Sequence, residues 1–147
     1  MVRASLDSNV LIYAELEPES ERGAQAQRII AAAAPGGILA AQALLEFLAV
    51  VRRRRPVSLP SAVAKVEAWS SVFEIAPTTV SVAKAASRLV REHDLQVWDA
   101  VIFCAGRAVG ASLLLSEDMQ DGLKLDGVRI ANPFNLSSGE LSALLAA

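Results

Sequence analysis

Glu46 occupies a position where an acid needs a special reason to be present. It lies inside an apolar run, in the stretch QALLEFLAVVRRRRP, residues 42–56. An ionised carboxylate among apolar neighbours is costly unless something positive meets it. The sequence therefore predicts that Glu46 faces a base or a metal ion. An ion pair with an arginine such as Arg53 or Arg88 is the simpler alternative.

Three further acids stand at the ends of apolar segments. Asp7 ends the segment RASLD, Asp99 precedes AVIFCA, and Asp118 follows LLLSE. In an open parallel sheet the carboxyl ends of the strands converge on one crevice, so we expect Asp7 and Asp118 to lie near each other. Glu46 and Asp99 can join them from helices that start at the same edge.

Four carboxylates in one crevice would repel one another, and some would stay protonated unless a cation lay between them. Mg²⁺ or Mn²⁺ is the natural cation because both prefer oxygen ligands. The chain has one histidine, His93, and one cysteine, Cys104, so it cannot build a histidine-rich or cysteine-rich zinc site. The sequence therefore predicts a magnesium or manganese site with oxygen ligands.

Three of these acids also have structural explanations, which the sequence leaves open. Asp7 can cap a turn that begins the next helix, and Asp99 can be the N-cap of a helix over residues 100–109. Asp118 suits a turn exposed to solvent. These explanations are reasonable one by one, but a shared site accounts for all the acids at once.

The elements that would position these acids alternate between strands and helices. The predicted strands cover residues 3–7, 37–41, 72–77, 111–116 and 127–134. The predicted helices cover residues 20–34, 42–55, 60–72, 79–93, 97–109 and 138–146, with a turn at Ser8 and Asn9 and a helix stop at Pro56. This order predicts an α/β fold, with a central, mostly parallel sheet flanked by helices, in a single domain over residues 1–147.

Composition restricts the class of protein further. The 147 residues are 53% hydrophobic and 20% charged, which favours a compact globular chain. The longest apolar run, residues 38–51, is shorter than the roughly 20 residues that a membrane span requires. No leader with a cleavage site opens the sequence. We therefore expect a cytoplasmic protein that does not insert into membranes.

A run of four arginines interrupts an otherwise acidic chain with a net charge of −2. It has two interpretations. Arginines at the end of a helix complement the helix dipole and are commonly just solvated. They can also bind the phosphates of a nucleic acid. The run consists of Arg52, Arg53, Arg54 and Arg55.

The remaining conspicuous side chains are expected to be structural. Trp69 and Trp98 are predicted to lie in the core rather than to stack on bases, and Cys104, among Ile102, Phe103 and Ala105, is also predicted to lie in the core. His93 is predicted to lie at the surface, near a helix end.

Four segments of the chain, in the right order, resemble those of the PIN-domain nucleases, and among them the VapC-type toxins of bacterial toxin–antitoxin pairs. The segments are LDSNVLIYA, AQALLEFLAVVRRR, VWDAVIFCAGRAVGASLLLSEDMQDG and DGVRIANPF. The resemblance implies a PIN-like three-layer α/β/α fold. The positions that match the family's acidic metal site are Asp7, Glu46, Asp99 and Asp118. Asn9, Ser116 and Asp121 match supporting polar positions.

The resemblance implies a metal-dependent endoribonuclease, the toxin of a VapBC-type pair. Its expected partners are RNA (a transfer RNA or another structured RNA), a cognate VapB-type antitoxin and a second copy of the chain. A haloacid-dehalogenase-like phosphatase and a non-catalytic PIN-like module that binds RNA or protein remain alternatives. The sequence contains no G-x-x-x-x-G-K-[ST], G-x-G-x-x-G or G-x-S-x-G motif, which disfavours phosphate-loop enzymes, dinucleotide binding and serine hydrolases.

Overall fold

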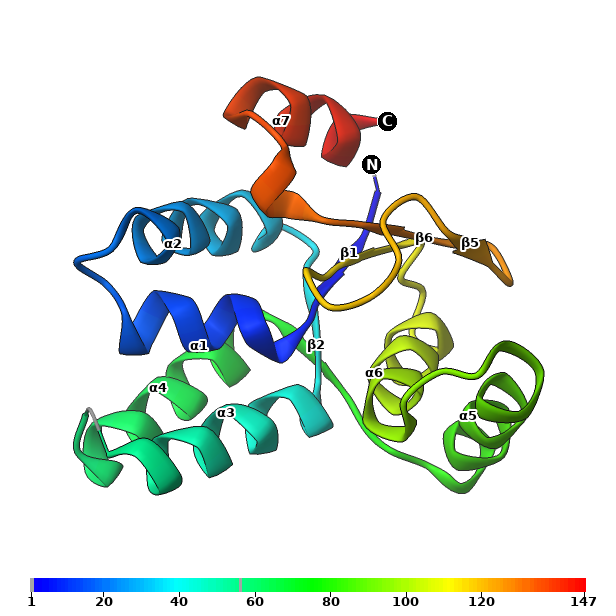
Figure 1. The fold of residues 1–147 in the computed structure, drawn as a ribbon, viewed down its shortest axis with the longest axis horizontal. Helices are drawn as coiled ribbons and strands as arrows, with labels where there is room; N and C mark the ends of the chain where they lie inside the picture. The colour runs from blue at the N-terminus through cyan, green and yellow to red at the C-terminus, as the bar shows by residue number, and fades with distance from the viewer. Residues whose placement is uncertain (1, 56) are drawn as a thin grey trace.

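A single sheet organises the part of the chain that the computed structural model describes, residues 2–55 and 57–147 (Figure 1). Its strands are β1 (Ala4–Leu6), β2 (Ile38–Ala40), β3 (Glu74–Ala76), β4 (Leu113–Leu115), β5 (Lys124–Leu125) and β6 (Val128–Ala131). The helices are α1 (Ser8–Leu16), α2 (Glu21–Ala33), α3 (Ala41–Arg54), α4 (Leu59–Val72), α5 (Val80–His93), α6 (Val97–Ala108) and α7 (Ser138–Ala146), with a 3-10 turn η1 (Pro133–Asn135).

The strands lie in the order β3-β2-β1-β4-β6-β5, and every neighbouring pair is parallel except β5 with β6. In the register of β1 with β4, Leu6 lies beside Leu115. The residues that follow these two, Asp7 and Ser116, therefore emerge side by side at the carboxyl edge of the sheet. This convergence is the property on which the predicted site depends.

Two hydrophobic clusters, one on each face of the sheet, form the core. Alternate residues of each strand point to opposite faces, so Leu113 and Leu115 join one cluster and Leu114 joins the other. The first cluster is completed by α1, α2, α4, α7 and most of α3, and the second by α5 and α6. Figure 1 shows these two groups of helices on opposite sides of the strands. The predicted α/β fold with helices on both faces is confirmed.

The predicted strand ranges each contain an observed strand, and the predicted helices agree with the observed ones to within one residue at each end. The main error is at Ser8 and Asn9, where a helix begins instead of a turn. Asp7 is the N-cap of α1, and its side chain accepts a hydrogen bond from the Ser8 amide. The short antiparallel strand β5 was not predicted, because two residues carry no periodic signal.

Helix α3 ends at Arg54, and Arg55 follows in the left-handed conformation, with φ of 55°. Pro56, the predicted stop of this helix, lies outside the described residues. Across residues 2–55 and 57–147, every helix is too short or too polar to cross a membrane.

Candidate active site

Asp7 lies behind the site, at the junction of β1 and α1. It is buried, with only 2% of its surface exposed. One carboxylate oxygen accepts the Ser8 amide at 2.7 Å, and the other accepts the Ser116 hydroxyl at 2.6 Å. The pKa of Asp7 is raised to about 6: burial raises it most, the hydrogen bonds from Ser116 and Ser8 lower it, and the charges of Asp118 and Glu46 raise it. Asp7 thus both caps the helix and belongs to a group of interacting carboxylates.

Glu46 lies on α3, and its two oxygens bind neutral donors. Oε1 accepts the Ser8 hydroxyl at 2.7 Å, and Oε2 accepts the Gln42 amide at 3.1 Å. Within the described residues Glu46 forms no ion pair, so the alternative of a salt bridge with Arg53 or Arg88 is wrong. Neutral hydrogen bonds satisfy the oxygens but leave the negative charge uncompensated, which still favours a cation.

Asp99 is the third residue of α6 rather than its N-cap. Gln96 is the N-cap, and its side-chain oxygen accepts the Asp99 amide at 2.9 Å. The predicted capping role is therefore wrong, and the Asp99 carboxylate is free for another use. Burial, followed by the charges of Asp7, Asp118 and Glu46, raises the pKa of Asp99 to about 6.

Asp118 completes the group from the loop after β4. It is exposed, and its backbone amide donates to the Ser116 hydroxyl oxygen at 3.2 Å. The same Ser116 hydroxyl donates to Asp7, so one serine links the buried acid to the loop that carries the exposed one.

An open hollow of about 620 Å³ brings these residues together. Glu46, Asp99 and Asp118 line it, as does Ser8, the hydrogen-bond partner of both Asp7 and Glu46. Asp7 itself lies behind this lining, near enough to raise the pKa of Asp99. Three of the four predicted acids thus line one hollow at the carboxyl edge of the sheet, and the fourth, Asp7, lies behind it.

A hard divalent cation fits the chemistry of this donor set. The acids offer only oxygen, their charges oppose one another, and a cation between them would relieve the repulsion. Asn9, beside Ser8 on α1, is buried, and neither atom of its side-chain amide has a hydrogen-bond partner. Such groups are rare unless they serve a function. In residues 2–55 and 57–147, however, no three acidic, histidine or cysteine side chains are already gathered as a ligand cluster.

Asp121, matched by the resemblance to a supporting position, has a structural contact instead. It is exposed, and its carboxylate accepts the Asn132 amide at 3.0 Å, which ties the loop after β4 to the end of β6. It is not among the residues that line the acidic hollow.

The four arginines are all exposed, but they face different places. Arg53 lines the acidic hollow. Arg52 and Arg55 line a second hollow, of about 560 Å³, with Val57, Ser58 and Leu59. Arg54 borders neither of these two hollows.

The prediction for Trp98 is wrong. It is 51% exposed and lines the acidic hollow together with Asp99. Trp69 and Cys104 are buried and His93 is exposed at the end of α5, as predicted.

Three residues that hold the acids carry only weak signals in the sequence. Gln42 stands four residues before Glu46, a spacing that places two side chains together on a helix. Gln96 stands three residues before Asp99, the spacing of an N-cap side chain to the backbone amide that donates to it, although glutamine is not a preferred cap. Ser8 directly follows Asp7, and only the tertiary structure brings it to Glu46.

The chain belongs to the PIN domain family. The family model matches residues 4–120, which include all four acids. No curated protein sequence matches the chain closely enough to count as a relative.

Solved structures of toxins share the fold. VapC20 of Mycobacterium tuberculosis, described as a sarcin-ricin loop cleaving toxin, superposes with a TM-score of 0.64 at 20% identity, over 78% of this chain and 91% of that one. A toxin–antitoxin complex from Klebsiella pneumoniae gives 0.67 at 19% identity, over 90% and 99%. DNA-bound VapBC from Salmonella typhimurium gives 0.63 at 16%, over 88% and 97%.

Proposed function

We propose that this protein is a metal-dependent endoribonuclease, and that it acts as the toxin of a VapBC-type toxin–antitoxin pair. The observation that carries the proposal is the single hollow lined by Glu46, Asp99 and Asp118, with Asp7 buried behind it and electrostatically coupled to them. Membership of the PIN domain family supports nuclease chemistry, and the fold shared with VapC-type toxins supports the toxin role.

In this proposal Asp7 and Asp99 are the principal metal ligands, and Glu46 and Asp118 complete the site directly or through water. Mg²⁺ or Mn²⁺ bound there would polarise the phosphoryl group and lower the pKa of the attacking water. The chain's own contribution is placement: Ser116 fixes the orientation of Asp7, and Ser8 and Gln42 fix that of Glu46.

A haloacid-dehalogenase-like phosphatase fits the structure less well. That chemistry uses the aspartate after the first strand as a nucleophile and a second aspartate two residues on as a general acid. Here the second position holds Asn9, whose amide cannot donate a proton as a general acid. The intact set of acids also disfavours a module that binds RNA or a protein without cutting it.

The deciding experiment supplies the purified protein with RNA and, separately, with a small phosphate monoester, each with Mg²⁺ or Mn²⁺. Cleavage inside the RNA without hydrolysis of the ester supports the proposed function. Hydrolysis of the ester alone would establish the phosphatase, and RNA binding without cleavage would establish the non-catalytic module.

Replacement of Arg53 by alanine should weaken RNA binding more than replacement of Arg54. Arg53 lines the acidic hollow and can offset the repulsion between its carboxylates and the RNA phosphates, whereas Arg54 lies on the same exposed helix end without bordering that hollow. Binding measured over a range of salt concentrations should show a slope reduced by about 1 for Arg53→Ala. If the salt dependence of RNA binding is equal for the parent, Arg53→Ala and Arg54→Ala, the four arginines are only a solvated helix end.

The toxin role also implies a homodimer and a cognate VapB-type antitoxin. An antitoxin arginine that enters the acidic hollow would satisfy the carboxylates through bidentate hydrogen bonds and take the electrostatic place of the cation. We therefore expect the antitoxin to abolish cleavage and to compete with Mn²⁺ for the protein. A stoichiometric complex that cleaves RNA at the rate of the free protein would contradict this role.

A further inference from the structure

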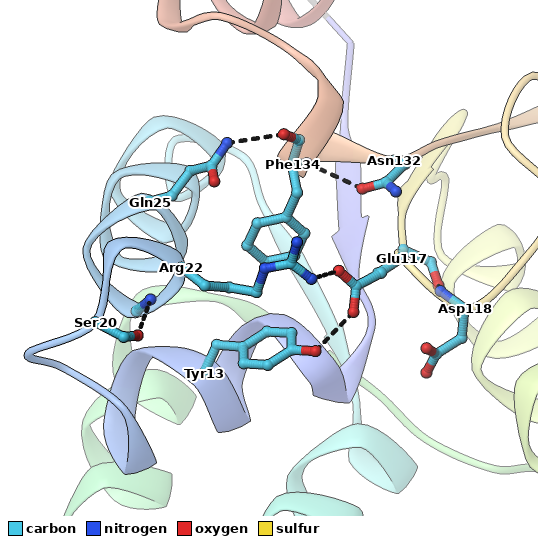
Figure 2. A network of polar contacts seen from close by, with 10 residues as sticks. Tyr13, Ser20, Arg22, Gln25, Glu117, Asp118, Asn132 and Phe134 are labelled. Atoms are coloured by element: carbon cyan, nitrogen blue, oxygen red, sulfur yellow. Dashed lines mark hydrogen bonds and ion pairs between the residues drawn. The ribbon is translucent and has the colours of Figure 1, made fainter.

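Glu117 stands between Ser116 and Asp118 but does not line the acidic hollow. Figure 2 shows its side chain pointing toward α1 and α2, while the Asp118 side chain lies on the other side of the loop. Only 20% of the Glu117 side chain is exposed. A charged group so far withdrawn from water needs specific partners.

Both Glu117 oxygens have a partner on a neighbouring helix. The Tyr13 hydroxyl, from α1, donates to Oε1 at 2.7 Å, and the Arg22 guanidinium, from α2, forms an ion pair with Oε2. Three elements that are distant in the sequence thus meet at one carboxylate (Figure 2).

Arg22 itself lies over two aromatic rings. Its guanidinium carbon lies 5.3 Å from the centre of the Tyr13 ring and 5.0 Å from that of Phe134 in η1, and the two rings meet edge to face at 5.4 Å. The Phe134 backbone is fixed in turn, because its carbonyl accepts the Gln25 amide and its amide donates to Asn132, both at 3.0 Å. Arg22 therefore has little freedom to leave Glu117.

This arrangement fixes the loop that carries Asp118 relative to the helix that begins at Asp7. The loop has no regular structure, and Asp118 is exposed and tied to Ser116 through its backbone amide. The direction of the Asp118 carboxylate therefore depends on where the loop is held. Met119, which is buried, holds it on one face of the sheet, and Glu117 holds it on the other.

We propose that Glu117, clamped by Tyr13 and Arg22, is a positioning residue that sets the place of Asp118 in the candidate active site. This inference rests on the proposed function, since it concerns the same site. Partners that orient metal ligands commonly contribute about 10-fold to 100-fold in metal affinity or activity. The loss of the Arg22 ion pair should therefore appear at the metal site, and not only in stability.

A second ion pair of the same construction provides a matched control. Glu15 of α1 pairs with Lys65 of α4 at 3.0 Å, and the Lys65 ammonium lies 5.6 Å from the centre of the Trp69 ring. This pair also joins two helices through a cation that rests on an aromatic ring, but neither partner lines the acidic hollow. Glu15→Gln therefore shows how much Tm falls when such an ion pair is lost away from the acidic hollow.

The test compares the parent with Glu117→Gln, Arg22→Gln, Arg22→Lys and Glu15→Gln in thermal melts, in Mn²⁺ binding followed by electron paramagnetic resonance, and in RNA cleavage. Glutamine at position 117 keeps an acceptor oxygen for the Tyr13 hydroxyl, but it removes the charge and the second acceptor oxygen that meet Arg22. Glu117→Gln and Glu15→Gln should lower Tm by similar amounts. Glu117→Gln and Arg22→Gln should weaken Mn²⁺ binding about tenfold or more, Arg22→Lys should restore part of it, and Glu15→Gln should match the parent.

Two outcomes overturn the inference in distinguishable ways. If the parent binds Mn²⁺ and cleaves RNA but Glu117→Gln binds Mn²⁺ as tightly as Glu15→Gln does, Glu117 is merely structural and the proposed function stands. If the parent neither binds Mn²⁺ nor cleaves RNA, the proposed function fails and the positioning role fails with it.

Discussion

Cleavage of RNA by this protein should stop when a chelator removes divalent cations, and should resume when Mg²⁺ or Mn²⁺ is restored in excess. Four carboxylates that repel one another cannot activate water or stabilise a phosphoryl group that is itself negative, so the metal-free site lacks the charge that the reaction needs. The expected loss is complete within the sensitivity of a gel assay.

The same experiment has a thermodynamic readout. A cation that binds only the folded protein raises its stability, so Tm of the parent should rise with added Mg²⁺ or Mn²⁺. Undiminished RNA cleavage in excess chelator would refute the metal mechanism.

Replacement of Asp99 by asparagine should lower RNA cleavage by a factor of about 100 or more while the metal-free protein stays as stable as the parent or becomes more stable. The charges of Asp7, Asp118 and Glu46, together with burial, raise the pKa of Asp99, so its ionised form costs stability at neutral pH. Asparagine removes this charge at nearly constant volume. The gain in Tm on addition of Mn²⁺ should be smaller for the variant, because one ligand is lost.

Asp94→Asn is the matched control. Asp94 is exposed, five residues before Asp99, and takes the left-handed conformation at the end of α5, with φ of 53°, which asparagine tolerates. The control should retain parental cleavage, Tm and response to Mn²⁺. An Asp99→Asn protein that behaves like Asp94→Asn in all three measurements would show that Asp99 is not part of the site.

The sequence was sufficient to predict that these acids lie at one edge of the sheet, because that placement depends only on topology. Asp7 follows β1 and Ser116 precedes Asp118 after β4, and parallel neighbours bring their carboxyl ends together whatever the side chains are. The helical and strand segments were long enough for their type and order, and therefore that topology, to be predicted. The helix start at Ser8 was missed because a serine and an asparagine after an aspartate also suit a turn, and β5 was missed because two residues carry no periodic signal.

The contacts within the site could not be predicted, because they depend on distances between elements. The apolar surroundings of Glu46 in the sequence predict that its carboxylate has a polar partner. Only the packing of α3 against α1 makes that partner the Ser8 hydroxyl rather than an arginine. A tryptophan is ordinarily expected in the core, yet Trp98 is 51% exposed and lines the acidic hollow, because exposure depends on the packing of the elements and not on the residue type. The clamp on Glu117 joins residues 13, 22 and 117, which no local pattern connects.

The two outer strands determine how other chains can approach the sheet. Edge strands expose unpaired backbone groups that can recruit a strand from another molecule. Here one edge is the two-residue strand β5, followed by a tight turn through Asp126 and Gly127, and the other is the three-residue strand β3, followed directly by Pro77. Glu74 at that second edge is also paired with Arg3. Edges this short and charged disfavour augmentation of the sheet, so we expect a binding partner to recognise helical surfaces and the acidic hollow rather than to add a strand.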